Sequence, residues 1–293
     1  MNIQQALSLE ISQATGEKFN ASSSHDAVGG SINRSITLTD GQRSFFVKLN
    51  QADQLAMFEA EAEGLNELRA NSGFVIPEVI ACGSDQSHAW LILEKLHFRP
   101  SGSEGYSKAG ETFAAMHQHK QARFGWHRNN TIGLTPQEND WTASWTAFWQ
   151  KHRLGFQIRL ARQNGFNSRT IDSCEQLNAS VGLFFDHDPQ PSLLHGDLWS
   201  GNLAFTAEGR PTIYDPALYY GDREADLAMT ELFGGFSAGF YEAYRYHYPL
   251  HSGYRIRKQL YNLYHVLNHM NLFGGGYENQ AFSISQKLLG EIK

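Results

Sequence analysis

The spacing of hydrophobic and polar residues in the first third of the chain predicts a small antiparallel sheet accompanied by helices. Residues 35–39 alternate between apolar and polar side chains, and the Asp40-Gly41 pair that follows is a strong hairpin signal. The apolar segment 44–49 then provides the return strand. The elements expected in this part are a helix over 3–15, strands over 35–39 and 44–49, a helix over 54–69, and strands over 75–82 and 89–93.

Helical periodicity dominates the chain after Leu96. The expected helices lie at about 107–120, 141–163, 168–185, 222–233, 236–246 and 255–270. A short β-like stretch interrupts them, with apolar segments at 193–194, 203–205 and 212–214. We therefore predict an α+β protein with a small β-rich N-lobe, residues 1–96, and a larger helical C-lobe, residues 97–293.

Composition narrows the class of protein. The chain has 293 residues, 41% of them hydrophobic, and its 24 basic and 30 acidic side chains give a net charge of −6. A mildly acidic chain lacks the basic surface that a nucleic-acid backbone requires, and no apolar run is long enough to span a bilayer. No secretory signal is visible, and Cys82 and Cys174 are too few for a disulfide framework. We therefore expect a cytoplasmic monomer that contacts neither nucleic acid nor membrane.

The strongest chemical signal is the octapeptide HGDLWSGN at 195–202. It has the form H-x-D-x-x-x-x-N, the spacing of a kinase catalytic loop. In that chemistry Asp197 accepts the proton of an attacking hydroxyl, Asn202 reaches back to a divalent cation, and His195 braces the loop. Because so short a pattern also arises by chance, further residues of the same chemistry are needed to support it.

Asp215 supplies a second carboxylate at the end of the apolar strand after Asn202. A hairpin between the two residues would bring the carboxylate beside the amide, and both offer the oxygen ligands that Mg²⁺ prefers. Taken alone, Asp215-Pro216 is equally well explained as the start of a turn. With the octapeptide upstream, we predict that Asn202 and Asp215 hold Mg²⁺.

An inward-pointing acid in the first helix of the sheet region needs a cationic partner. Glu61 falls on the same helical face as Met57, Leu65 and Leu68, whereas Glu59, Glu63 and Glu67 form a separate acidic line that we expect to face solvent. An unpaired buried carboxylate is very costly, and Lys48 at the end of the strand 44–49 is the nearest candidate. A Lys48–Glu61 pair would place the lysine on the phosphates of ATP.

Two further sequence features fit a nucleotide site. Gly29 and Gly30 lie in a turn before the hairpin, where backbone amides can cover phosphates, although paired glycines alone indicate only a turn. Leu93, Glu94 and Lys95 stand where strand gives way to helix, the place of an adenine-binding hinge. The chain has no G-x-x-x-x-G-K-[ST], which excludes a P-loop NTPase. His265 and His269 have a zinc-like spacing, but a polar helix face explains them better.

With these residues, the chain resembles the aminoglycoside-phosphotransferase and choline-kinase-like branch of the protein-kinase fold, and more narrowly the fructosamine kinase (ketosamine-3-kinase) family. The segments that carry the resemblance are HGDLWSGN (195–202), IYDPALYYGDRE (213–224), FFVK (45–48), MFEAEAEGL (57–65), FG (124–125) with NDW (139–141), and WTAFWQKHRL (145–154). Two departures from protein kinases stand out: Asp215 is followed by Pro-Ala, and no A-P-E segment follows it. Neither favours a regulated activation loop.

The resemblance implies a bilobal protein-kinase-like fold and an ATP- and Mg²⁺-dependent kinase that phosphorylates a sugar hydroxyl of a ketoamine, free or protein-bound. It implies Asp197 as base, Asn202 and Asp215 as metal ligands, Lys48 paired with Glu61 at the phosphates, and Leu93, Glu94 and Lys95 as the adenine hinge. Trp199 would form a wall for the sugar, or else pack under the loop. Alternatives are a kinase for an aminoglycoside, choline or free sugar, and a nucleotide-binding pseudokinase.

Overall fold

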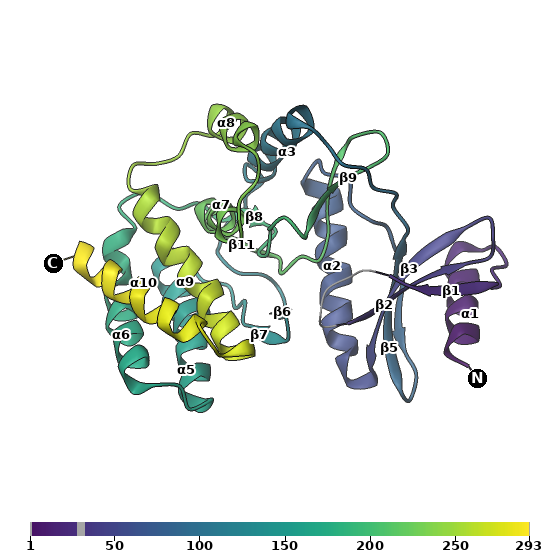
Figure 1. Cartoon of the computed structure of the whole chain (residues 1–293), viewed down its shortest axis with the longest axis horizontal. Helices are drawn as coiled ribbons and strands as arrows, with labels where there is room; N and C mark the ends of the chain where they lie inside the picture. Colours follow the sequence, from purple (N-terminus) through teal and green to yellow (C-terminus); the bar gives the residue numbers. More distant parts are fainter. Residues whose placement is uncertain (1, 28–32, 293) are drawn as a thin grey trace.

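A five-stranded antiparallel sheet forms the N-terminal part of the computed structural model, which describes residues 2–27 and 33–292. Its strand order is β1-β2-β3-β5-β4 (Figure 1). The strands are β1 Ser23–Asp26, β2 Arg34–Thr39, β3 Ser44–Gln51, β4 Val79–Ser84 and β5 His88–Glu94. The Asp40-Gly41 turn joins β2 to β3 as the sequence predicts: the Asp40 carboxylate accepts the N–H groups of Gln42 and Arg43 at 2.9 and 2.7 Å.

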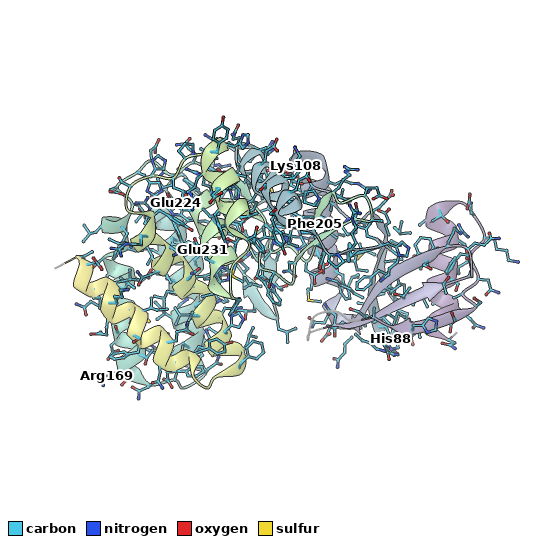
Figure 2. The ribbon with its side chains drawn as sticks, turned by 45° about the horizontal axis from the view of Figure 1, so that its top comes forward. His88, Lys108, Arg169, Phe205, Glu224 and Glu231 are labelled. Carbon is cyan, nitrogen blue, oxygen red and sulfur yellow. The ribbon has the colours of Figure 1, made fainter. Side chains whose placement is uncertain are left out.

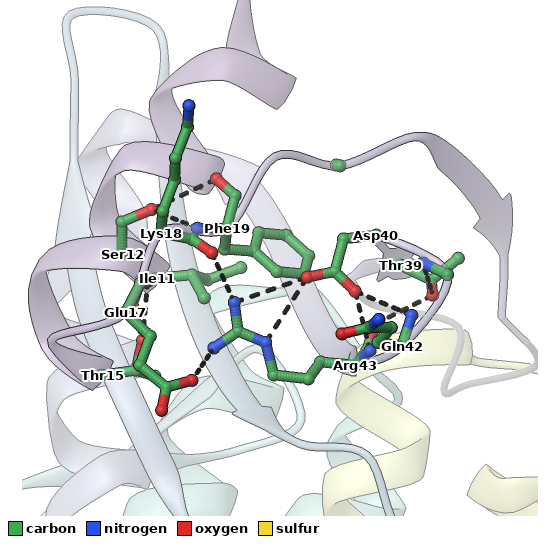
Figure 3. Close-up of polar contacts among 12 residues, drawn as sticks. Ile11, Ser12, Thr15, Glu17, Lys18, Phe19, Thr39, Asp40, Gln42 and Arg43 are labelled. Atoms are coloured by element: carbon green, nitrogen blue, oxygen red, sulfur yellow. Dashed lines mark hydrogen bonds and ion pairs between the residues drawn. The ribbon is translucent and has the colours of Figure 1, made fainter.

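The Arg43 side chain fastens this hairpin to the first helix. Its guanidinium donates to the Glu17 carboxylate at 2.8 Å and to the Lys18 carbonyl at 2.7 Å, and it lies 5.5 Å from the centre of the Phe19 ring (Figure 3). The segment after α1 (Ile3–Thr15) is thereby held against the β2–β3 turn.

Two helices cover opposite faces of the sheet, α1 on the outer face and α2 (Leu55–Asn71) on the inner one (Figure 1). Because side chains alternate along a strand, neighbouring residues of β5 enter different hydrophobic clusters. Trp90 and Ile92 pack with α1, whereas Leu91 and Leu93 join α2 and the helical C-terminal part. The same alternation turns Lys48 of β3 away from its neighbour Val47, which packs in the α1 cluster.

Helices make up most of the C-terminal part. They are α3 Ser103–Met116, α4 Trp145–Phe148, α5 Gly155–Gln163, α6 Ser168–Ala179, α7 Arg223–Leu232, α8 Ala238–His247, α9 Tyr254–Phe273 and α10 Tyr277–Glu291, with a π-helical turn Trp149–Leu154 between α4 and α5. Three short antiparallel strand pairs lie among them: β6 Asn130–Ile132 with β7 Thr135–Gln137, β8 Ser192–Leu194 with β11 Tyr219–Gly221, and β9 Leu203–Phe205 with β10 Pro211–Ile213. Along the described residues, no helix combines the length and apolar character that a membrane crossing needs.

The structure differs from the hydrophobic pattern where a local feature stops an element. The strand expected from residue 75 starts at Val79, because Val75 pairs instead with Thr212 of β10. The helix expected from residue 141 starts at Trp145, because the Ser144 hydroxyl caps it. The pattern also does not predict β1, β6, β7, β11 or α10, since several are only three residues long and the buried face of α10 includes alanine and serine.

The close packing of α3 on α8 predicts that alanine substitutions at two glycines change the stability of the protein very differently. A methyl group on Gly110 of α3 would lie 2.1 Å from the carbonyl oxygen of Phe240 in α8, whereas one on Gly290 of α10 would meet nothing within 4 Å. We expect Gly110→Ala to lower the free energy of unfolding by about 1–3 kcal/mol or more, as overpacking does. The matched control Gly290→Ala should be neutral or stabilise by up to ~1 kcal/mol. Urea unfolding measures both, and equal stability of the two variants would contradict this packing.

Candidate active site

A cleft of about 960 Å³ lies between the inner face of the sheet and the C-terminal part. Every described site residue predicted from the sequence lines it: Lys48, Glu61, Leu93, Glu94, Lys95, Asp197, Trp199, Asn202 and Asp215. Gly29 and Gly30 lie outside the described residues. The cleft thus joins residues from β3, α2, β5 and the loops that flank the β9–β10 hairpin.

Lys48 connects three segments of the chain through its ammonium group. Its Nζ lies 2.5 Å from Oε1 of Glu61 in α2, as expected, and 2.6 Å from Oδ1 of Asp215, which was not expected as its partner. Only 5% of Lys48 is exposed. Burial opposes the charged form, but the carboxylates of Asp215 and Glu61 outweigh it and raise the pKa of Lys48 above its ordinary value. Lys48 is therefore a cation at neutral pH.

The 195–202 loop is held by a buried carboxylate from α7. Asp226 accepts the backbone N–H groups of His195 at 2.7 Å and Gly196 at 2.9 Å, and its Oδ2 lies 3.3 Å from His117 Nε2 at the end of α3. Burial opposes the ionisation of Asp226, but the contact with His117 and the other favourable interactions keep its pKa below the ordinary value. Gly196 is required here, because a Cβ at its φ of +82° would lie 2.0 Å from the Ala217 carbonyl oxygen.

His195 braces the loop with both ring nitrogens. Nε2 donates to the Tyr214 carbonyl at 3.0 Å, because a carbonyl can only accept. Nδ1 is then the accepting nitrogen and receives the backbone N–H of Asp197 at 3.3 Å. Burial lowers the pKa of His195, which favours this neutral ring. The ring therefore connects the backbone of Asp197 to the strand that leads into Asp215.

Asn202 and Asp215 are brought together by the β9–β10 hairpin, as the sequence predicts. The Tyr214 N–H donates to the Asn202 carbonyl at 3.3 Å, and Asn202 Nδ2 donates to the Asp197 carbonyl at 2.8 Å. The amide oxygen of Asn202 has no hydrogen bond among the described residues. Asp215 has a φ of +59°, the one positive φ of a described residue other than glycine. An amide oxygen and a carboxylate in one cleft form a donor set suited to Mg²⁺.

Asp197 lies partly buried in the cleft, in the electrostatic setting of a proton acceptor. Burial, with the negative charges of Asp215 and Asp226, raises its pKa well above the ordinary value. A carboxylate of raised pKa holds an accepted proton more readily than an exposed one.

The hydrogen bonds at the end of β5 limit which backbone groups of the expected hinge are available to a ligand. The backbone N–H of Glu94 donates to the Glu78 carbonyl at 2.8 Å, and the Glu94 carboxylate accepts the Glu78 N–H at 3.2 Å. The N–H of Glu94 is therefore occupied by the β4–β5 pairing. Leu93, Lys95 and the next residue, Leu96, also line the cleft, and the Lys95 ammonium lies 5.5 Å from the centre of the Phe46 ring.

Trp199 packs on the loop and also faces the cleft. Its ring covers the backbone of Gly201, where a Cβ would lie 2.4 Å from the indole. It is also 37% exposed and lines the cleft. Trp145, Phe148 and Trp149 are buried in the main core instead.

Two acids expected to face solvent connect α2 to the C-terminal part. The Glu63 carboxylate pairs with Arg128 and lies 2.7 Å from His127 Nε2. The Tyr220 hydroxyl donates to Glu67 at 2.5 Å. The solvent-facing prediction is confirmed for Glu63, which is exposed while it makes these contacts, but it is wrong for Glu67, which is partly buried under Tyr220. Sequence periodicity does not show what packs beside a polar face. These contacts hold the helix that carries Glu61.

The sequence pattern also did not identify Asp226, or Phe233 and Phe273, which line the cleft. Asp226 lies one turn inside α7, next to the apolar run 227–229, and an acid in that setting is the signal that could have revealed it. Asp222 caps α7. Two of the residues labelled in Figure 2, Glu224 and Glu231, belong to α7.

Glu224, His187 and Asp222 lie close enough together to hold a metal ion. Glu224 is already engaged, however, in a buried ion pair with Arg257 at 2.6 Å.

Comparison with known proteins gives a consistent result. A family model described as fructosamine kinase matches residues 3–291. A Synechocystis protein named as a probable ketoamine kinase is 48% identical over 286 residues, which cover 97% of this chain and 96% of that protein. The chloroplastic protein-ribulosamine 3-kinase of Arabidopsis thaliana is 39% identical over 90% of this chain and 82% of that protein.

Solved structures show the same relationship at the level of fold. The crystal structure of a candidate fructosamine-3-kinase from Haemophilus somnus 129PT matches with a TM-score of 0.90 and 29% identity, covering 98% of this chain and 100% of that one. An aminoglycoside phosphotransferase matches with a TM-score of 0.65 and 16% identity, over 97% of this chain and 98% of that one, a likeness of fold alone. The chain therefore has the bilobal protein-kinase-like fold, with an antiparallel-sheet N-lobe and a helical C-lobe.

Because Lys48 has two carboxylate partners, we expect its substitution and that of Glu61 to lower the stability by different amounts. Glu61→Gln leaves Lys48 paired with Asp215, whereas Lys48→Met leaves two carboxylates without their cation. We expect Lys48→Met to destabilise the protein more, and the pair to show a coupling of about 0.5–3 kcal/mol in urea unfolding. Full additivity of the two single changes would contradict the pairing.

Proposed function

This chain belongs to the fructosamine kinase family, and we propose that it transfers the γ-phosphoryl group of ATP to a sugar hydroxyl of a ketoamine. The observation that carries the proposal is the convergence of Lys48, Asp197, Asn202 and Asp215 in one cleft, although they come from separate segments. These are the charges and oxygen ligands that phosphoryl transfer needs, arranged as in the kinase template.

In the proposed reaction, Lys48 neutralises phosphate charge while Glu61 fixes its ammonium. Bound Mg²⁺ would add charge neutralisation at the phosphates, held by the Asn202 amide oxygen and the Asp215 carboxylate. The oxygen of the acceptor hydroxyl forms a bond to the γ-phosphorus while Asp197 accepts the hydroxyl proton. The bond from that phosphorus to the bridging oxygen breaks, and ADP leaves. The raised pKa of Asp197 suits this role.

The two lobes divide this work. We assign the covering of ATP to residues 1–96, with Gly29 and Gly30 over the phosphates and the segment 93–95 beside adenine. We assign catalysis and acceptor binding to residues 97–293. Because the Glu94 N–H is already bonded to Glu78, carbonyl groups and the N–H groups beyond Glu94 must provide the adenine contacts.

The acceptor class rests on the relatives, two of which are named for ketoamine and ribulosamine substrates. A ketoamine is the rearranged product of a sugar aldehyde and an amine, and its phosphorylation at O3 is the reaction that we propose. Trp199 offers a flat apolar face to the sugar ring beside Asp197. We further propose that the enzyme acts as a cytoplasmic monomer in the repair of glycated amines.

Removal of the proposed base should separate catalysis from nucleotide binding. We expect Asp197→Asn to lower kcat by about 10²–10⁴-fold, because the hydroxyl proton loses its acceptor, while ATP affinity changes little. Steady-state kinetics and calorimetric titration with ATP measure the two effects. The control Asp188→Asn changes an exposed carboxylate outside the cleft and should leave both parameters unchanged. Near-normal turnover by Asp197→Asn would contradict its role as base.

A panel of acceptors tests the substrate class. We expect lysine modified with ribulose or fructose to be phosphorylated with a higher kcat/KM than kanamycin, choline or free ribose. Phosphorus NMR of the product should place the phosphate on O3. If an aminoglycoside or choline is the best acceptor, the ketoamine assignment is wrong and only a kinase of another specificity remains. Loss of ATP turnover with every acceptor would instead indicate a pseudokinase.

A further inference from the structure

A row of aromatic rings extends from the 195–202 loop to the outer end of the cleft. The Trp199 ring meets Phe233 edge-on at 6.2 Å between ring centres, and Phe233 lies 5.1 Å from His269. His269 in turn lies 5.6 Å from Phe273. All four residues line the cleft, and we call them the aromatic row. They come from the 195–202 loop, the C-terminal end of α7 and the C-terminal end of α9.

The members of the aromatic row are unusually accessible for large apolar residues. Trp199 and Phe233 are each 37% exposed, and Phe273 is 61% exposed. Phe273 is the last residue of α9, and Phe233 follows the last turn of α7. Both therefore lie at helix ends, where the packing of the core does not require a large exposed apolar side chain. Exposed aromatic faces gathered around a pocket are typical of a binding surface.

Charge is distributed unevenly between the two ends of the cleft. Lys48 and Lys95 lie at the end proposed for the nucleotide. The described C-lobe lining residues include two carboxylates, Asp197 and Asp215, and Asp215 is paired with Lys48. The neutral lining residues there include Asn130, Thr131, Ile132, Gly133, Met229, Asn268 and Leu272. The other described lining carboxylates already have partners: Glu61 and Asp215 pair with Lys48, Asp26 pairs with Arg34, and Glu94 accepts the Glu78 N–H. If Asp197 serves the hydroxyl, no lining carboxylate without a partner is left for an ammonium group.

His269 has a fixed orientation within the row. Its Nδ1 donates to the His265 carbonyl at 2.8 Å, since that oxygen can only accept. Nε2 has no hydrogen-bond partner among the described residues and is the remaining ring nitrogen available to a ligand. His265 itself is buried rather than on a polar face, and burial lowers its pKa to about 3, so it adds no positive charge beside the row.

We propose that the aromatic row binds the amine-bearing part of the acceptor, a single alkyl-substituted ammonium group with its apolar chain. The inference rests on the ketoamine kinase function proposed above. Trp199 covers the sugar, and the faces of Phe233 and Phe273 hold the cation by cation–π attraction. The ammonium N–H donates to Nε2 of His269. Recognition through ring faces, without a carboxylate, suits one alkylated charge next to an apolar chain.

The same arrangement discriminates against two other acceptor classes. An aminoglycoside carries several ammonium groups, and each would lose hydration in a cleft whose carboxylates other than Asp197 already have partners. A neutral sugar would leave the row in contact with a hydroxyl or with water instead of a cation. The row therefore acts on substrate binding, and its removal should raise KM with little change in kcat.

The test compares two acceptors that differ in one atom. N-butyl fructosamine carries the ammonium, and the 1-O-butyl ether of fructose replaces it with a neutral oxygen. We expect Phe233→Leu and Phe273→Leu each to lower kcat/KM for the amine by about 3- to 30-fold, through KM, and to change the ether less than twofold. Phe273→Tyr keeps the aromatic face and should retain the preference for the amine.

Phe98→Leu is the matched control, because Phe98 is an exposed phenylalanine of the same cleft that stacks on Tyr214 instead of the aromatic row. It should leave the amine-to-ether ratio unchanged. Equal losses for both acceptors in the Phe233 and Phe273 variants, or no losses, would overturn cation recognition by the row while the kinase function stands. If the unmodified protein phosphorylates neither acceptor nor any other ketoamine, the proposed function itself fails and the inference falls with it.

Discussion

The position of the 195–202 loop depends on the buried carboxylate of Asp226. A carboxylate without partners inside a protein is very costly, so its hydrogen bonds are also structural requirements. Asp226 takes two of them from the loop backbone and contacts His117 at the end of α3. Asp197 and Asn202 depend on the same bonds: the His195 ring accepts the Asp197 N–H, and Asn202 donates to the Asp197 carbonyl. A residue that lines no part of the cleft thus determines the geometry of two that do.

A second set of contacts connects the catalytic residues of the C-lobe to the N-lobe. Lys48 is held between Glu61 of α2 and Asp215, so the sheet, the helix and the β9–β10 hairpin share one ammonium group. Glu63 and Glu67 fasten α2 to the C-lobe on the side away from Lys48. The helix that orients Lys48 is therefore held without a phosphorylated loop, which agrees with the Pro-Ala that follows Asp215 in place of an activation segment.

Spacing along the chain predicted those features that depend on short-range geometry. The Asp40-Gly41 hairpin, the inward position of Glu61 and the approach of Asn202 to Asp215 all follow from local periodicity and turn chemistry. Contacts between distant segments were not predictable in this way. The bond between Tyr220 and Glu67 and the bonds from Asp226 to the loop depend on tertiary packing, and the occupied N–H of Glu94 depends on strand register. Among the strands of three residues, β6, β7 and β11 were too short for periodicity to reveal.

The division of the protein into two lobes does not match the division of its hydrophobic interior. One cluster is confined to α1 and the outer face of the sheet, with Val47 and Ile92 among its members. The other begins on the inner face with Leu91 and continues without interruption through α2 to Leu288 in α10. A chain cut near residue 96 would leave α2 on the inner face of the sheet but expose to water the side of α2 that packs on the C-terminal part. The two lobes thus share most of one hydrophobic interior, and the helix that carries Glu61 depends on the C-terminal part for its covering.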